Sequence, residues 1–350
     1  MTDIAPPRRR SGRFWLYTPF LLLIVAALGW SAFWFVVRGR VSEAVDQALA
    51  QEQGRGRSWT CTDRSITGFP FRVELRCAAL SLTSARWGET VKVETGPALA
   101  LGQIYSPGLV IFQLGGPLKA TLPEGRVLDV AWTRLEASLA HREPQRVAIV
   151  VTGPNATLSA PGYAAESWRA TTLEAHLRRN PARPAEQQVV DASIEVKGSV
   201  LPALDALLGT AEPGDVDIQA SLSQADAFRI GLNPDALEAW RNAGGQIEIS
   251  RFVSLKGKAR VEASGRLLID QTHRPAGQIQ AAIAGIDQIG GFRIGGLTAG
   301  IGSLLGGLTG AAPPPAATPG MTALPPLVLR EGRAYLGPIR LPLQPLPALY

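Results

Sequence analysis

The 350-residue sequence has little of the chemistry on which metal and thiol sites depend. It contains two cysteines, two methionines and three histidines, His141, His176 and His273. The patterns G-x-S-x-G, G-x-x-x-x-G-K-[ST], G-x-G-x-x-G and H-E-x-x-H are all missing, and they serve acyl transfer, phosphate binding, dinucleotide binding and zinc binding. We therefore expect no catalytic residues, no metal and no cofactor, and a protein that is not an enzyme.

Charge is also scarce outside the first forty residues. Charged side chains make up 18% of the chain, below the roughly 25% of an average soluble domain. The net charge is +6 and the pI is about 9.7, but residues 1–40 hold six arginines against one acid. The remaining 310 residues are almost neutral, with basic and acidic side chains interleaved. No basic stripe is left to follow a phosphate backbone, so we expect no nucleic-acid partner.

Residues 14–37 form an uncharged run of 24 residues. As a helix this run is about 36 Å long, enough to cross a hydrocarbon core of about 30 Å. Four arginines precede it and two follow, and this bias predicts a cytoplasmic N-terminus; the four are Arg8, Arg9, Arg10 and Arg13. A cleaved signal peptide is the alternative, but its apolar region is about 7–15 residues long and ends in a small-residue cleavage site. The length favours an uncleaved inner-membrane anchor.

The rest of the chain is predicted to be mainly β. Residues 71–77 and 259–269 alternate apolar and polar side chains, as strands with one buried face do. Residues 246–255 and 278–284 flank the second of these and complete an antiparallel meander. Further strands are predicted at 91–101, 108–114, 126–138, 146–152, 166–177, 188–197 and 327–341. Two short helices interrupt them, at 201–208 and at 234–243, where Asn233 and Pro234 form a capped start.

These elements predict a single-pass membrane protein with a long, twisted, mostly antiparallel sheet. Two short helices are too few to cover so many half-apolar strands. The sheet therefore either folds on itself as a sandwich or curls around an apolar ligand. The predicted parts are a cytoplasmic tail (1–13), a transmembrane helix (14–37), a juxtamembrane helix and linker (38–57), and a periplasmic β-rich domain (58–350) with a glycine- and proline-rich insert at about 290–326.

The segment 294–312 is uncharged and contains seven glycines. Its GxxxG spacings are typical of closely packed membrane helices, so a second membrane span is one interpretation. So much glycine makes a poor helix, however. A glycine-rich loop or interfacial helix is the interpretation we favour.

Cys61 and Cys77 lie 16 positions apart in two predicted strands joined around Gly68, Phe69 and Pro70. In an exported, oxidising location such a pair favours a disulfide that staples a hairpin. Free thiols or half of a metal site are the alternatives, and no nearby histidine completes a tetrahedral ligand set.

Several short motifs recur in an order that resembles a known bacterial family. They are Gly-Phe-Pro-Phe-Arg (68–72) between the two cysteines, Leu-Glu-Ala-Trp (237–240) before two glycines, Gly-Arg-Leu-Leu-Ile-Asp (265–270), and Gly-Arg-Ala-Tyr-Leu-Gly-Pro (332–338). In this order they resemble the domain-of-unknown-function 2125 family. The resemblance implies a membrane-tethered protein of the Gram-negative envelope without an assigned activity.

The leading functional hypothesis is the binding or passage of lipid or another hydrophobic ligand, which rests on analogy with other anchored, curled β-sheets. The alternative is an envelope scaffold that recruits protein partners by adding strands to exposed sheet edges. The inner membrane, a hydrophobic ligand and an envelope protein are thus the expected partners. An enzyme is the third hypothesis, disfavoured by the missing motifs.

Overall fold

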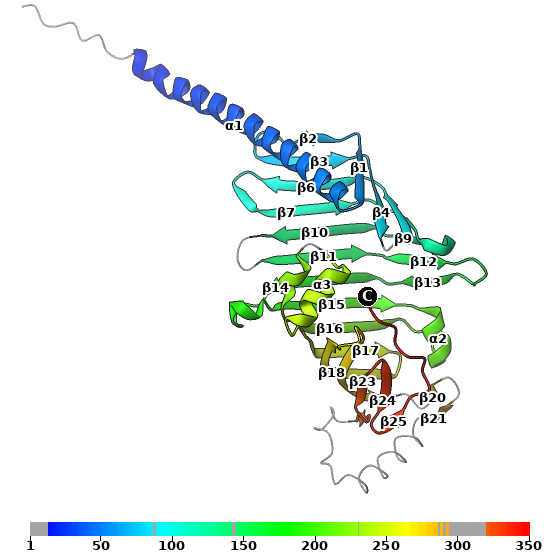
Figure 1. Cartoon of the computed structure of the whole chain (residues 1–350). Helices are drawn as coiled ribbons and strands as arrows, with labels where there is room; N and C mark the ends of the chain where they lie inside the picture. Colours follow the sequence, from blue (N-terminus) through cyan, green and yellow to red (C-terminus); the bar gives the residue numbers. More distant parts are fainter. Residues whose placement is uncertain are drawn as a thin grey trace, which may run out of the picture.

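The structure is a computed structural model that describes residues 13–86, 89–141, 145–229, 231–285, 288–289, 292–293 and 320–350. It consists of a long N-terminal helix followed by antiparallel strands in two large open sheets (Figure 1). The predicted fold class is therefore confirmed. The helices are α1 (Arg13–Gly54), α2 (Pro202–Leu208) and α3 (Pro234–Asn242).

The larger sheet has sixteen strands and the smaller has seven. The larger contains β2 (Ser65–Thr67), β3 (Arg72–Cys77), β6 (Ala98–Gln103), β7 (Ser106–Leu114), β10 (Arg134–Ala140), β11 (Arg146–Thr152), β14 (Thr172–Arg179), β15 (Val190–Ser199), β16 (Gly214–Leu222), β17 (Ile247–Lys256), β18 (Ala259–Ile269), β19 (Pro275–Ala284), β22 (Thr322–Ala323), β23 (Leu327–Arg330), β24 (Arg333–Leu336) and β25 (Ile339–Arg340). The smaller contains β1 (Arg57–Thr62), β4 (Ala79–Arg86), β5 (Glu89–Thr95), β8 (Leu118–Thr121), β9 (Val127–Ala131), β12 (Asn155–Ser159) and β13 (Glu166–Arg169). A separate pair is formed by β20 (Gln288–Ile289) and β21 (Phe292–Arg293).

The apolar run lies inside α1, which continues to Gly54 as the helix-forming residues after the run predict. Leu16–Gly54 has a window with mean hydropathy 2.4 that is only 6% buried, so this helix could span a membrane. Its far end is fixed to β1, because Arg57 Nη2 donates to Glu52 Oε1 at 2.7 Å. The hydrogen bond from the Arg57 guanidinium lowers the pKa of Glu52 to about 2.

Between β3 and β14 the chain passes repeatedly from one sheet to the other. Each crossing is a bend of one to three residues, and the bends lie side by side along a line that we call the crease. Backbone hydrogen bonds continue across it: Gly115 N donates to Pro97 O at 2.7 Å, and Gly153 N donates to Thr171 O at 2.8 Å. The bends are Ala78; Gly96 and Pro97; Gly115, Gly116 and Pro117; Trp132 and Thr133; Gly153 and Pro154; and Ala170 and Thr171. Up to β14, each long strand of a single antiparallel meander is therefore bent at the crease. One half of the strand lies in the larger sheet and the other half in the smaller sheet.

The crease corrects three predicted strands. The segments 91–101, 126–138 and 166–177 were expected to be continuous, but each is divided between the two sheets. These segments alternate less regularly than 71–77 and 259–269, and their pattern does not show where the bend lies. The bend requires glycine where the backbone is left-handed: Gly153 has φ +61°, and a side chain there would lie 3.0 Å from Thr133 Oγ1.

The meander predicted around 259–269 is confirmed as β17, β18 and β19, and the closing strands predicted at 327–341 are β23, β24 and β25. Both short helices are also present. Asn233 Oδ1 accepts a hydrogen bond from Ala236 N at 2.7 Å, as the predicted cap requires. Trp240 of α3 is buried and donates from Nε1 to Ser223 O at 2.7 Å. The segment 294–312 lies outside the described residues.

Cys61 and Cys77 form the predicted disulfide, with their Cα atoms 5.2 Å apart. As predicted, it staples a hairpin, because the arm β1–β2 pairs with the arm β3–β4 on either side of the turn at Gly68 and Pro70. The sequence did not show that this hairpin is bent at the crease, which leaves Cys61 in β1 of the smaller sheet and Cys77 in β3 of the larger sheet. The bond therefore ties the two sheets together beside the crease.

We expect the double variant Cys61→Ala/Cys77→Ala to lower the free energy of unfolding by about 3 kcal/mol. The bridge restricts the conformations of the unfolded chain, and without it the unfolded state gains entropy. Thermal unfolding of the full chain in detergent measures the effect. Reductant should lower the Tm of the wild type to that of the double variant and leave the variant unchanged. A wild-type Tm that does not move on complete reduction would contradict this role.

Candidate functional site

One face of the larger sheet carries apolar side chains in register across eleven strands, β3 to β19. The strand pairings place these residues directly opposite one another, so they form one row across the sheet. With about 4.8 Å between strands, the row is about 48 Å long. Its members are Leu75, Ala100, Phe112, Ala137, Ile149, Ala175, Ile194, Ile218, Phe252, Ala263 and Ala281.

The smaller sheet has a matching apolar face. The paired residues across six of its strands are Trp59, Leu82, Val93, Ala120, Leu128 and Leu158. The residues between them point to the opposite face and are polar, as Lys92, Lys119 and Asp129 illustrate. Each strand of this sheet thus has one face suited to water and one suited to an apolar neighbour.

The two apolar faces are turned toward each other. Cys61 shares a face with Trp59, Cys77 shares a face with Leu75, and the disulfide joins the two. At the other end of the smaller sheet, Trp168 Nε1 donates to Ser199 Oγ of the larger sheet at 2.9 Å. We call the pair of facing surfaces the apolar wedge.

The wedge is closed at the crease and open at the opposite margin. Next to the crease, Val151 is 9% exposed and Cys77 is 8% exposed. At the strand ends far from the crease, Leu139 and Leu158 are each 37% exposed and Leu177 is 43% exposed. Among the described residues no large side chain is less than 2% exposed. Apolar surface at the margin therefore remains accessible to a ligand.

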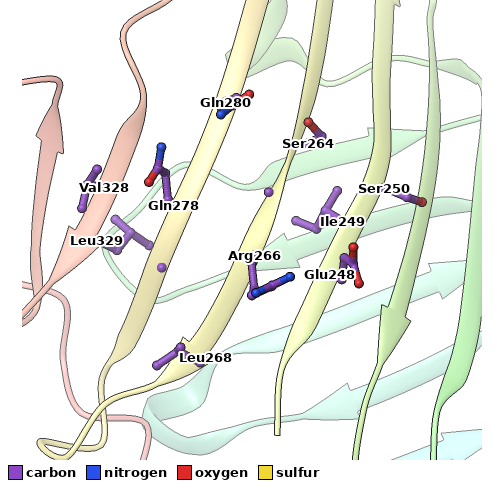
Figure 2. Close-up of a pocket in the computed structure, with 12 residues that line it drawn as sticks. Glu248, Ile249, Ser250, Ser264, Arg266, Leu268, Gln278, Gln280, Val328 and Leu329 are labelled. Carbon is purple, nitrogen blue, oxygen red and sulfur yellow. The ribbon is translucent and has the colours of Figure 1, made fainter. Parts of the chain in front are cut away.

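The opposite face of the larger sheet is mostly polar from β14 to β19 and holds a concavity of about 840 Å³ there. Figure 2 shows the exposed side chains of Glu248, Arg266 and Gln278 on adjacent strands β17, β18 and β19. Glu248 Oε2 lies 3.6 Å from Arg183 Nη2, with both side chains about half exposed. A second concavity of about 480 Å³ includes His176. Within the described ranges, no three His, Cys, Asp or Glu side chains are grouped to hold a metal ion.

The structure brings together only the two cysteines among the residues singled out by the sequence. Arg13 is the first residue of α1, and Arg8, Arg9 and Arg10 lie outside the described residues. Sequence reasoning predicted a sheet that folds on itself or curls around a ligand, but it missed where the crease lies and which residues form the wedge. A signal for the crease exists, because its bends recur at intervals of 17 to 21 residues.

These features define a class: a β-rich chain with an N-terminal helix that could span a membrane and two open sheets with facing apolar surfaces. Residues 34–345 match the model of the family described as "Uncharacterized protein conserved in bacteria (DUF2125)". The chain therefore belongs to this family, as its ordered motifs suggested. No curated protein and no solved structure shows a significant match to it.

Because the wedge is open at the margin and closed at the crease, a new charge should be tolerated at the margin and not beside the crease. We expect Leu177→Lys to change the Tm by about 2 °C or less, because the new ammonium reaches water. Val151→Lys on the same face should lower the Tm by about 8 °C or more, since it places an unpaired charge beside the crease. Thermal unfolding in detergent makes the comparison, and equal losses at the two positions would show that the wedge is closed throughout.

Proposed function

We propose that this protein binds lipid or another elongated hydrophobic ligand in the apolar wedge, while anchored to the bacterial inner membrane. One observation carries the proposal: large apolar side chains remain more than a third exposed along facing sheet surfaces. Fully burying one leucine stabilises by about 1.5–3 kcal/mol. A ligand that covers several half-exposed side chains therefore gains several kcal/mol from the hydrophobic effect alone.

The shape of the wedge favours a long, narrow ligand. The part of the apolar row that faces the smaller sheet, from β3 to β14, is about 24 Å long, and the row continues on the larger sheet to about 48 Å, whereas one leaflet contributes only about 15 Å of hydrocarbon. The row itself contains no charged side chain from Leu75 to Ala281. Acyl chains fit such a surface, and their polar head groups can remain in water at the open margin.

Recruitment of protein partners by strand addition is the second candidate; the smaller sheet offers edge strands of six and four residues, β1 and β13, but the edges of the larger sheet give it little support. The larger sheet ends in β2 and β25, which have three and two residues. Short edge strands offer few unpaired backbone groups to a partner. Ligand binding in the wedge has the more direct support, from its exposed apolar side chains.

The proposed location is the inner membrane, with the N-terminus in the cytoplasm and the sheets in the periplasm. The arginines before α1 support this orientation through the positive-inside rule. The Cys61–Cys77 disulfide supports an oxidising compartment.

We expect alkaline phosphatase fused after Tyr350 to be active and green fluorescent protein fused there to be dark. Alkaline phosphatase needs the oxidising periplasm to form its disulfides, and the fluorescent protein does not mature there after unfolded export. A bright fluorescent fusion with an inactive phosphatase fusion would reverse the proposed orientation.

Native mass spectrometry of the gently extracted protein tests the ligand. We expect co-purified lipid on the wild type and at least fivefold less on Leu177→Lys, because the ammonium lies at the apolar margin. His176→Lys is the matched control, since His176 is the exposed neighbour on the opposite face of β14. Its lipid load should equal that of the wild type. A wild-type protein that is consistently empty would contradict the proposal.

A further inference from the structure

The turn between β2 and β3 packs against α1 inside the apolar run (Figure 1). The ring of Phe69 meets that of Trp34 edge to face, with centroids 5.4 Å apart. The ring of Phe71 lies 6.0 Å from that of Trp30. Yet Phe69 remains 53% exposed and Phe71 remains 60% exposed. Two large aromatic side chains of the sheet region thus extend the exposed apolar surface of the helix.

Hydrogen bonds fix this contact. Trp30 Nε1 donates to Pro70 O at 2.8 Å, and Trp34 Nε1 donates to Arg72 O at 2.9 Å. Trp34 is only 3% exposed. In hydrocarbon, an unpaired indole N–H or backbone carbonyl costs several kcal/mol, because no water can replace the missing partner. The two tryptophans therefore donate hydrogen bonds to carbonyls at the turn and at the start of β3. These hydrogen bonds allow the contact to lie where no water is present.

The level of the contact follows from the helix geometry. Arg38 is the first charge after the apolar run, and such charges lie at the lipid head groups. Trp34 and Trp30 precede Arg38 by four and eight residues, which is about 6 and 12 Å along the helix axis. If α1 spans the bilayer, the turn lies below the head groups of the leaflet at the C-terminal end of the run.

The turn also lies at one end of the apolar wedge. Strand β3 runs from Arg72 to Cys77, and the crease follows Cys77. Arg72 and the turn before it are therefore at the open margin. Leu75, three positions before the crease residue Ala78, is the first residue of the apolar row.

We infer that residues 68–71 insert into the membrane beside α1 and hold the β2–β3 end of the wedge open to the lipids of that leaflet. The second half of this inference rests on the proposed function. The partner is a lipid bilayer, because the contact surface consists of exposed aromatic rings continuous with a helix of membrane-spanning length. The wedge then receives its ligand laterally, from the leaflet in which its anchor is embedded.

Photocrosslinking in vesicles of phosphatidylethanolamine and phosphatidylglycerol tests the insertion. The full chain carries p-benzoylphenylalanine in place of Phe71, and mass spectrometry quantifies lipid attached to the residue-71 peptide. We expect at least tenfold more lipid adduct than with the same probe at Tyr163. Tyr163 lies in the turn between β12 and β13 and is 82% exposed, so as a control it is an aromatic residue at least as accessible as Phe71. Equal adduct at both positions would overturn the insertion.

The same probe at Phe112, which is 39% exposed in the apolar row, tests lipid entry. We expect vesicle lipid to attach there, and at least fivefold less to attach in Phe69→Ser/Phe71→Ser. Capture of soluble dihexanoyl-phosphatidylcholine by the probe should be unchanged in that variant, which shows that the wedge remains folded. Undiminished capture of vesicle lipid would overturn entry through the turn.

The two proposals fail in different ways. Lipid adduct at position 71 without capture of either lipid at position 112 would contradict ligand binding in the wedge and leave the insertion standing. Capture of both lipids at position 112 without adduct at position 71 would overturn the insertion and support the proposed function.

Discussion

The architecture depends on the crease, where one antiparallel ladder bends and continues. A sheet with one apolar face must cover that face, and folding the meander in two covers it with the chain's own neighbouring strands. Hydrogen bonds such as Gly153 N to Thr171 O keep the backbone paired through the bend. The disulfide between Cys61 and Cys77 adds a covalent tie beside this line, at the end where the folding in two begins.

The smaller sheet covers the apolar face of the larger sheet only in part, because the two sheets differ in extent. The smaller sheet has seven strands against sixteen, and it ends at β13. Beyond β14 the larger sheet continues without further crossings, so the apolar row reaches Phe252 and Ala281 outside the span of the smaller sheet. The sheets also diverge from the crease, and Leu177 at the margin is 43% exposed whereas Val151 beside the crease is 9% exposed. A surface of this kind is suited to a ligand that completes the apolar layer.

The helix and the sheets are connected more firmly than a simple tether would require. Arg57 and Arg64 pair with Glu52 and Asp46 near the end of α1. Two indole N–H groups and four aromatic rings connect the apolar run to the first hairpin of the larger sheet. The orientation of the wedge relative to the helix is therefore set by specific contacts at two levels, one polar and one apolar.

Much of this structure follows from local patterns. Uncharged length determines the helix, alternation determines the strands, and Asn233 with Pro234 determines the start of α3, because each depends on residues close in sequence. The sequence also indicated the cysteine pair, but not that its members lie in different sheets. Three predicted strands proved to be bent, since alternation shows which side chains share a face and not where the backbone turns. Only the tertiary structure decided that the two apolar faces meet at the crease and part at the margin, because that depends on pairing between strands far apart in the chain.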